Sequence, residues 1–177
     1  MLKGNRIYLR LFEKEDLHLR VKWINDEETN KTLGFDIPVS LAKTQAWFQN
    51  SLTDNSKVNF AIVDIETDKV IGMSGLINID YKNKNAEYYI TIGEKEYLGK
   101  KLPDEVAELI LNYGFNHIGL FKVYLHTFDY NTKAQHVYLR NGFIKEGTLR
   151  KHKWKDGKFI DIIYYGITID EWRNKID

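Results

Sequence analysis

The chain has 177 residues, a formal net charge of +1 and no cysteine. The length suits one domain, and the missing thiols exclude a disulfide framework, a thiolate zinc site, a cysteine nucleophile and a thioester carried on the protein. The balanced charge gives no field that would attract nucleic acid. No apolar run approaches the ~18 residues of a membrane span, and the first residues lack a signal-peptide pattern. We therefore expect a cytoplasmic protein with no nucleic-acid or membrane partner.

Hydrophobic periodicity predicts two helices and four strands in the N-terminal half. Residues 6–12 alternate as a strand does, a helical stretch starts at Asp16, and residues 40–52 form a second amphipathic helix. The segment 25–38 between the helices is polar and is expected to be irregular. Three further strands are predicted at 58–65, 69–79 and 86–93, with polar turns between them.

The C-terminal half alternates helices and strands. A long helix is predicted at 103–118, where Pro-Asp-Glu suits the first turn. It is followed by a strand at 122–128, a helix at 132–140, a strand at 142–149, a hairpin turn at 154–157 and a last strand at 159–167. The order predicts an α/β fold whose mixed, mostly antiparallel sheet is flanked by helices on both faces.

The most specific segment is 131–143, NTKAQHVYLRNGF. Asn131 suits the N-cap of a helix, and Gly142 stands where a left-handed residue ends one. These features alone describe a capped amphipathic helix. The spacing Asn-x-x-Ala-x-x-x-Tyr-x-x-x-Gly-Phe also resembles the coenzyme-A-binding motif of the GNAT superfamily of N-acetyltransferases.

A second segment, 92–106 (IGEKEYLGKKLPDEV), resembles the strand, loop and helix with which that superfamily binds the cofactor pyrophosphate. From residue 6 to 172 the chain is similar to the RimJ/RimL-type branch, which acetylates ribosomal-protein N-termini, polyamines and amino groups of nucleotide sugars. The resemblance implies one GNAT-like domain over residues 1–177, acetyl-CoA (coenzyme A) as co-substrate and no metal. Dimers occur among related proteins, so the choice between a monomer and a homodimer stays open.

The predicted pyrophosphate loop departs from the family pattern Gln/Arg-x-x-Gly-x-Gly/Ala. Lys101 and Pro103 stand at the two glycine positions, Pro103 has no N–H to donate, and the acidic residues after it put negative charge at the helix end. Either the neighbouring lysines compensate as point charges, or the loop binds nothing. The resemblance implies cofactor contacts at Ile92, Lys100, Lys101, Leu102, Pro103, Asn131 and Tyr138.

The same resemblance implies direct attack of a neutral amine on the thioester. An alkylammonium has a pKa near 10.4, so a base must help at pH 7. That role falls on Glu87, acting through water, while a backbone N–H near Ile92 stabilises the oxyanion and Tyr138 protonates the departing thiolate. The competing interpretations are a solvated Glu87 and a Tyr138 that only packs. His126 is a reserve base or a half-buried residue, and we favour the second.

Two charged regions are candidates for choosing the acceptor. Asp26 and Glu28 lie in the segment that shapes the acceptor pocket in related proteins, and an acidic pocket suits a polyamine. The basic segment 150–155 suits an anionic acceptor such as a nucleotide sugar. The predicted function is acetyl transfer to a primary amine of a small molecule, either a polyamine or an amino sugar. The alternatives are a ribosomal-protein N-terminal acetyltransferase and a non-catalytic binding protein of the same fold.

Overall fold

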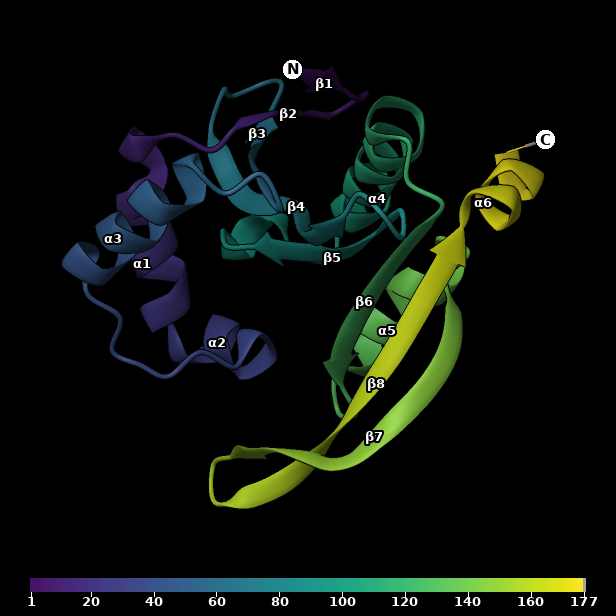
Figure 1. Ribbon diagram of the computed structural model, residues 1–177. Helices are drawn as coiled ribbons and strands as arrows, with labels where there is room; N and C mark the ends of the chain where they lie inside the picture. The colour runs from purple at the N-terminus through teal and green to yellow at the C-terminus, as the bar shows by residue number, and fades with distance from the viewer. Residues whose placement is uncertain (177) are drawn as a thin grey trace.

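The computed structural model describes residues 1–176 and contains one eight-stranded sheet within them (Figure 1). The strand order is β1-β2-β3-β4-β5-β6-β8-β7. The strands are β1 Leu2–Lys3, β2 Ile7–Leu11, β3 Val58–Asp64, β4 Val70–Asp80, β5 Asn85–Ile92, β6 Lys122–Phe128, β7 Ile144–Lys155 and β8 Lys158–Thr168. All neighbours are antiparallel except β5 and β6. The mixed, mostly antiparallel sheet predicted from the sequence is confirmed.

Helices cover both faces of this sheet. They are α1 Leu17–Asn25, α2 Glu27–Leu33, α3 Leu41–Leu52, α4 Leu102–Asn112, α5 Thr132–Arg140 and α6 Ile169–Ile176, with 3₁₀ turns η1 Lys14–Asp16 and η2 Lys95–Tyr97 and a π-helical segment η3 Tyr113–Ile118. Successive residues of a strand point to opposite faces. In β3, Phe60 therefore packs in the core that contains α4, whereas Ala61 packs with α1 and α3.

Three predicted elements differ in the structure. The segment expected to be irregular contains α2, because the Asp26 side chain accepts the Thr29 N–H at 2.9 Å and Gly34 ends the helix at φ 73°. The long helix is α-helical only to Asn112 and continues as η3. The strand expected to end at residue 149 extends to Lys155, so the hairpin turn is confined to residues 156–157.

The sheet divides where β5 and β6 part. They pair only over residues 85–87 of β5 and 122–124 of β6, and beyond Glu87 the two strands diverge. Figure 1 shows β6, β8 and β7 turning away from β5 as a separate arm. The edge of β5 that faces this arm is therefore left without a neighbouring strand.

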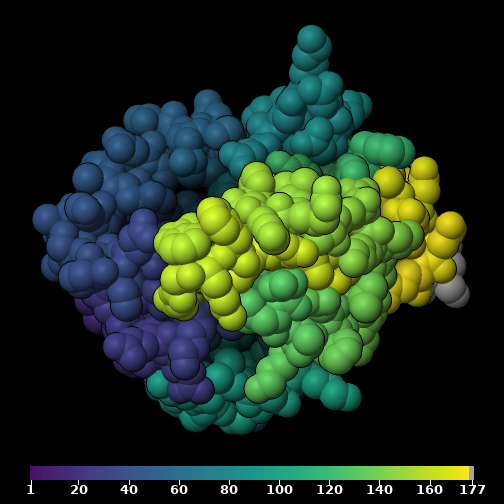
Figure 2. Space-filling view, turned by 90° about the horizontal axis from the view of Figure 1, so that it is seen from below, coloured from purple at the N-terminus to yellow at the C-terminus, as the bar shows by residue number. Residues whose placement is uncertain are grey.

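The tip of the β7–β8 hairpin returns to α2 and closes the far end of the opening. Lys153 Nζ donates to the Gly34 carbonyl at 2.9 Å, and Lys155 Nζ donates to the carbonyls of Asn30 and Lys31 at 2.9 and 3.0 Å. Cations stabilise the carbonyl end of a helix. Figure 2 shows the hairpin against the N-terminal helices, with the surface hollowed between them.

Candidate active site

The loop between β5 and α4 presents a row of free backbone N–H groups. Gly99 and Lys101 have left-handed backbones, with φ 77° and 57°. Arg6 donates to the carbonyls of Lys100 and Lys101 at 2.8 and 3.3 Å. The N–H of a trans peptide points opposite to its C=O, so the N–H groups that follow these carbonyls point away from Arg6. Within residues 1–176, none of the four N–H groups from Gly99 to Leu102 donates to another protein group, an arrangement that suits phosphate.

The loop therefore keeps the backbone shape that the family pattern requires, although Lys101 replaces a glycine. A non-glycine residue at φ 57° is strained, and this strain is the cost of the substitution. The Lys100 ammonium lies 4.8 Å from the centre of the Tyr97 ring. The Leu102 side chain is buried in the core, so this residue can offer only its backbone N–H. Pro103 begins α4 and has no N–H to offer.

The acidic residues at this helix end are already paired. Asp104 accepts two hydrogen bonds from Arg140, both at 2.7 Å, and Glu105 pairs with Arg6 at 3.2 Å. Burial favours the neutral form of Asp104, but the bonds from Arg140 and Asn141 outweigh it and lower its pKa below the ordinary value. Beside them lies a cavity of about 850 Å³ whose lining includes Lys101, Asp104 and Arg140. The predicted repulsion of a phosphate by these carboxylates is therefore largely compensated.

Ile92 lies on the open edge of β5. The next N–H, that of Gly93, donates to the Ile71 carbonyl of β4 at 2.9 Å. Bonding directions alternate along an antiparallel pair, so the Ile92 N–H points away from β4, toward the side from which β6 has diverged. This is the direction that the predicted oxyanion contact requires.

Tyr138 lies on α5, on the face of the sheet that carries α4. Its ring contacts Phe143 and Tyr165, with both pairs of ring centres 6.0 Å apart. Burial raises the pKa of the Tyr138 hydroxyl to about 12, so it stays protonated at physiological pH and available as a donor. Asn131 caps the same helix by accepting the Ala134 N–H at 3.3 Å, as predicted.

Glu87 lies on the opposite face, at the last paired position before β5 and β6 part. One carboxylate oxygen is 2.6 Å from His126 Nδ1, and the other accepts a hydrogen bond from Asn78 at 2.9 Å. The Glu87 side chain is 13% exposed, so the interpretation of a solvated strand residue is wrong. The His126 side chain is 43% exposed and in contact with Glu87, so the favoured interpretation of a half-buried residue is wrong.

The His126 pair controls the ionisation of Glu87. Burial alone would raise the pKa of this carboxyl, but the hydrogen bond and charge of His126, with the Asn78 bond, lower it below its usual value. Glu87 is therefore an ionised acceptor held in one orientation. The adjacent Tyr124 hydroxyl has a raised pKa, first because of burial and then because of the Glu87 charge.

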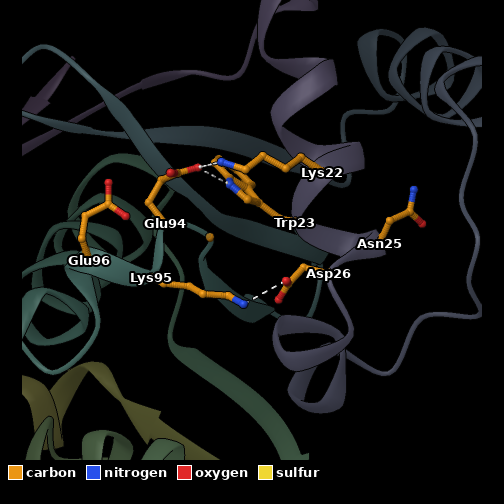
Figure 3. A pocket seen from close by; sticks show the side chains of 8 residues that line it. Lys22, Trp23, Asn25, Asp26, Glu94, Lys95 and Glu96 are labelled. Atoms are coloured by element: carbon orange, nitrogen blue, oxygen red, sulfur yellow. Dashed lines mark hydrogen bonds and ion pairs between the residues drawn. The ribbon is translucent and has the colours of Figure 1, made fainter.

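The predicted acceptor residues Asp26 and Glu28 come together at Lys95. The Lys95 ammonium lies 2.9 Å from an Asp26 oxygen and 3.0 Å from a Glu28 oxygen. Asp26 lines a cavity of about 410 Å³ formed by the end of α1 and the segment after β5 (Figure 3). The Thr29 N–H and then Lys95 lower the pKa of Asp26 to about 2. Both carboxylates therefore share one lysine, which leaves the three groups with one net negative charge, and sequence reasoning did not connect this lysine with them.

Glu94 ties α1 to the end of β5 in the same cavity. Figure 3 shows its carboxylate receiving Lys22 and the Trp23 ring N–H, at 2.7 and 2.9 Å. Lys69 lies 3.2 Å from the other oxygen. Burial opposes ionisation, but these three donors outweigh it and lower the Glu94 pKa to about 2. Glu94 is the structural link between the N-terminal helices and the strand that carries Glu87.

Most of the chain matches a known protein family. Residues 6–144 match the Acetyltransferase (GNAT) domain family. The chain belongs to this family. It is 29% identical to a spermidine N(1)-acetyltransferase of Vibrio cholerae over 90% of this chain and 91% of that protein. It is also 29% identical to the uncharacterized N-acetyltransferase p20 of Bacillus licheniformis, over 97% of each chain.

The fold agrees with this membership. The crystal structure of spermidine N-acetyltransferase from Vibrio cholerae in complex with CoA and spermine superposes with a TM-score of 0.90 and 27% identity, covering 96% of this chain and 99% of that one. The chain is an acetyl-CoA-dependent N-acetyltransferase. No helix among residues 1–176 is long and apolar enough to cross a membrane.

Proposed function

We propose that Glu87, oriented by His126, removes the proton from the acceptor amine, and that Tyr138 donates a hydrogen bond to the departing sulfur. The observation that carries this proposal is the 2.6 Å Glu87–His126 contact at the point where β5 and β6 part. Glu87 lies on one face of the sheet there and Tyr138 on the other. A thioester placed in the opening has the base on one side and the sulfur donor on the other.

Acetyl-CoA supplies the acetyl thioester, and the residues around the opening bind and orient it. The free N–H groups of Gly99 to Leu102 take the pyrophosphate, with Lys101 as a point charge, and the Ile92 N–H receives the developing oxyanion. An ordinary thiol has a pKa near 8.5, well below the value of about 12 at Tyr138. The Tyr138 hydroxyl therefore acts as a hydrogen-bond donor more readily than as a source of a fully transferred proton.

Two structural features favour a small acceptor over a protein N-terminus. The hairpin lysines Lys153 and Lys155 close one end of the opening by bonding to α2. The N-terminal helices bound the other side, and an extended peptide needs a longer open groove. The relatives include spermidine acetyltransferases, so polyamines and amino sugars are the first acceptors to test.

The domain organisation, cellular location and assembly of the chain are also proposals. We propose that residues 1–177 form one acetyltransferase domain, because β8 completes the sheet beyond the matched residues 6–144. The RimJ/RimL-type assignment, the cytoplasmic location, the absence of nucleic-acid binding and a homodimer stay predictions from the sequence. A non-catalytic role is disfavoured by the intact backbone shape of the loop and by the Glu87–His126 pair.

The test begins with calorimetric titration of acetyl-CoA and of free CoA, followed by an acetylation screen of spermidine, glucosamine, a nucleotide amino sugar and a ribosomal N-terminal peptide. Micromolar Kd values and acetylation of a small amine are expected. Absence of binding at millimolar ligand, where even a weak site gives about −4 kcal/mol, favours the non-catalytic alternative. Acetylation of the peptide alone favours the ribosomal alternative.

The proposed base is tested by Glu87→Gln. General-base loss lowers kcat by roughly 10²- to 10⁴-fold, with the acetyl-CoA Kd unchanged. His126→Asn removes the group that lowers the Glu87 pKa, so the acid limb of the rate–pH profile moves to higher pH. Glu66→Gln, an exposed carboxylate in the β3–β4 turn, is the control. Unchanged turnover in Glu87→Gln removes Glu87 from the reaction.

A further inference from the structure

Strand β4 carries one extra residue beside the proposed base. Ile77 of β4 is the register partner of Glu87, but beyond this pair two residues of β4 face a single residue of β5. Such two-against-one pairing is a β-bulge, a feature that re-aims side chains and is common next to active sites. The extra residue is Asn78, whose backbone is left-handed at φ 52°. The bulge therefore begins directly after the position that pairs with Glu87.

The bulge turns Asn78 to the face of the sheet that carries Glu87. In a regular strand the faces alternate, so residue 78 would share the core face of Leu76. The extra residue shifts this alternation by one, because Ile79 is buried in that core and Asn78 is exposed. Asn78 Nδ2 donates to a Glu87 oxygen at 2.9 Å. Without the bulge the carboxamide would point to the opposite face and could not make this contact.

Packing does not explain the choice of asparagine at this position, because the side chain is exposed. Backbone preference does not explain it either, since glycine adopts a left-handed conformation more readily than asparagine does. The contact with Glu87 does explain it. An ionised carboxylate only accepts hydrogen bonds, and a carboxamide supplies a donor without adding a charge. Asn78 therefore has the side chain that suits a neutral donor to the proposed base.

His126 and Asn78 hold the Glu87 carboxylate from the two strands that flank β5. His126 of β6 lies 2.6 Å from one oxygen, and Asn78 of β4 bonds to the other. The terminal torsion of a glutamate side chain is broad, so one anchored oxygen leaves the carboxylate plane free to turn. Two anchors on opposite sides fix this plane at the point where β5 and β6 part.

We propose that Asn78 is a positioning residue for acetyl transfer, which holds the Glu87 carboxylate in the orientation that receives the amine proton. This inference rests on the proposed function, because it requires Glu87 to be the base. The bulge is then the feature of the fold that supplies the second anchor. The same bond favours the ionised form of Glu87 and helps to lower its pKa, together with the larger effect of His126.

Other titratable groups on this face of the sheet come from the neighbouring strands. They are His126 and Tyr124 of β6, Tyr164 of β8 and Asp80 of β4. Tyr164 lies beside His126, with ring centres 5.5 Å apart, and Asp80 is held by two bonds from Asn83. All of these groups are unchanged in variants at position 78. A difference in the rate–pH profile between such variants therefore reports the Asn78 contact.

Asn78→Gly removes the carboxamide and keeps the left-handed backbone. With the small amine that is acetylated fastest, kcat should fall about tenfold, because a hydrogen bond to a charged group is lost. The acceptor KM and the CoA Kd should stay within about threefold, and the acid limb of the rate–pH profile should move to higher pH. Lys84→Gly is the matched control, since exposed Lys84 has φ 54° in the β4–β5 turn. If Asn78→Gly behaves like Lys84→Gly, the proposal is overturned.

Asn78→Asp tests the contact without a change of shape. Aspartate also tolerates the left-handed backbone, but it cannot donate when ionised and it places a second negative charge beside Glu87. A like charge raises the pKa of a carboxyl, so the acid limb should move further than in Asn78→Gly. A wild-type profile in Asn78→Asp would show that residue 78 does not act on Glu87.

Carboxyl NMR distinguishes failure of this inference from failure of the proposed function. The Glu87 carboxyl carbon, labelled with ¹³C and assigned by its loss in Glu87→Gln, should titrate at higher pH in Asn78→Gly than in wild type. If it does so while Glu87→Gln keeps full turnover, the contact is upheld and Glu87 is rejected as the base. If Glu87→Gln is slow but the titration is unchanged in Asn78→Gly, the positioning role is overturned and the base stands.

A double variant closes the test. Once Glu87 is replaced by glutamine, adding Asn78→Gly should change kcat by less than about twofold, because the group that Asn78 positions is already lost. A further tenfold loss in the double variant would place the action of Asn78 elsewhere and overturn the proposal.

Discussion

The site has a donor end, the loop and helix start at residues 99–105, and an acceptor end, around Asp26, Glu28 and Lys95. Both ends pair acidic residues with cations, but they differ in the charge that remains. Asp104 is paired with Arg140 at the donor end, and Asp26 with Lys95 at the acceptor end. The donor end keeps the exposed charges of Lys100 and Lys101, whereas one Lys95 faces both Asp26 and Glu28 at the acceptor end and leaves one negative charge there. An exposed charge is screened by water and contributes little, whereas a buried one is costly and strong. Burial, rather than the end of the site, should therefore decide the size of each effect.

The largest expected effect in this comparison comes from a buried polar group on the donor face. Tyr138→Phe removes the hydroxyl proposed to donate to the departing sulfur and should lower kcat by roughly 10²-fold or more, about 3 kcal/mol of barrier. The acetyl-CoA Kd should stay within about twofold, because the ring and its packing remain. Tyr81→Phe is the matched control, since that hydroxyl donates to the Asn55 carbonyl at the surface. Turnover like that of the control would leave Tyr138 with packing alone.

The next largest effect is expected on stability at Glu94, which holds α1 against the end of β5. Glu94→Gln keeps an acceptor for Trp23 but leaves Lys22 and Lys69 without their buried partner, so we expect a loss of about 2 kcal/mol. That loss lowers the melting temperature by about 4–8 °C at this chain length. Glu96→Gln, which breaks an exposed pair with the same Lys69, should cost at most about 0.5 kcal/mol.

The stabilities of the wild type and of Glu94→Gln should also depend differently on pH. The pKa of Glu94 is lowered from 4.5 to about 2, so its contribution to stability is present above about pH 4.5 and disappears as the pH falls toward 2. The wild type should therefore lose stability on acidification faster than Glu94→Gln, and the two melting temperatures should converge near pH 2. Parallel curves would show that Glu94 is not the group that titrates.

Much of the fold follows from local patterns in the sequence, and the site follows less completely. The strand at residues 122–128 and the helix at 132–140 have the predicted bounds, because alternation, the Asn131 cap and Gly142 mark their ends. The helix α2 was missed because it is short and polar, although Asp26 and Gly34 are ordinary cap residues.

The charge partners depend on contacts between distant segments, and no local pattern contains them. Glu87 meets His126 only because β5 and β6 run parallel in a register that brings residue 87 beside residue 124. Lys95 meets Asp26 across nearly seventy residues of chain. Glu87 was a candidate from the sequence, but the sequence could not show that His126 lowers its pKa or that Lys95 pairs with both Asp26 and Glu28.

The smallest expected effects are at Lys101, where the leftover charge is exposed. Lys101→Ala should weaken CoA binding only about twofold to fivefold by calorimetry, because a solvated point charge adds little to the backbone N–H groups. Lys101→Gly should weaken it equally, yet raise the free energy of unfolding by about 0.5 kcal/mol, since glycine relieves the left-handed strain at φ 57°. Lys84→Ala, which removes an exposed lysine at another left-handed position (φ 54°) in the β4–β5 turn, is the control. If Lys101→Ala weakens CoA binding a hundredfold, the lysine rather than the backbone holds the phosphates, and an exposed charge then matters as much as a buried one.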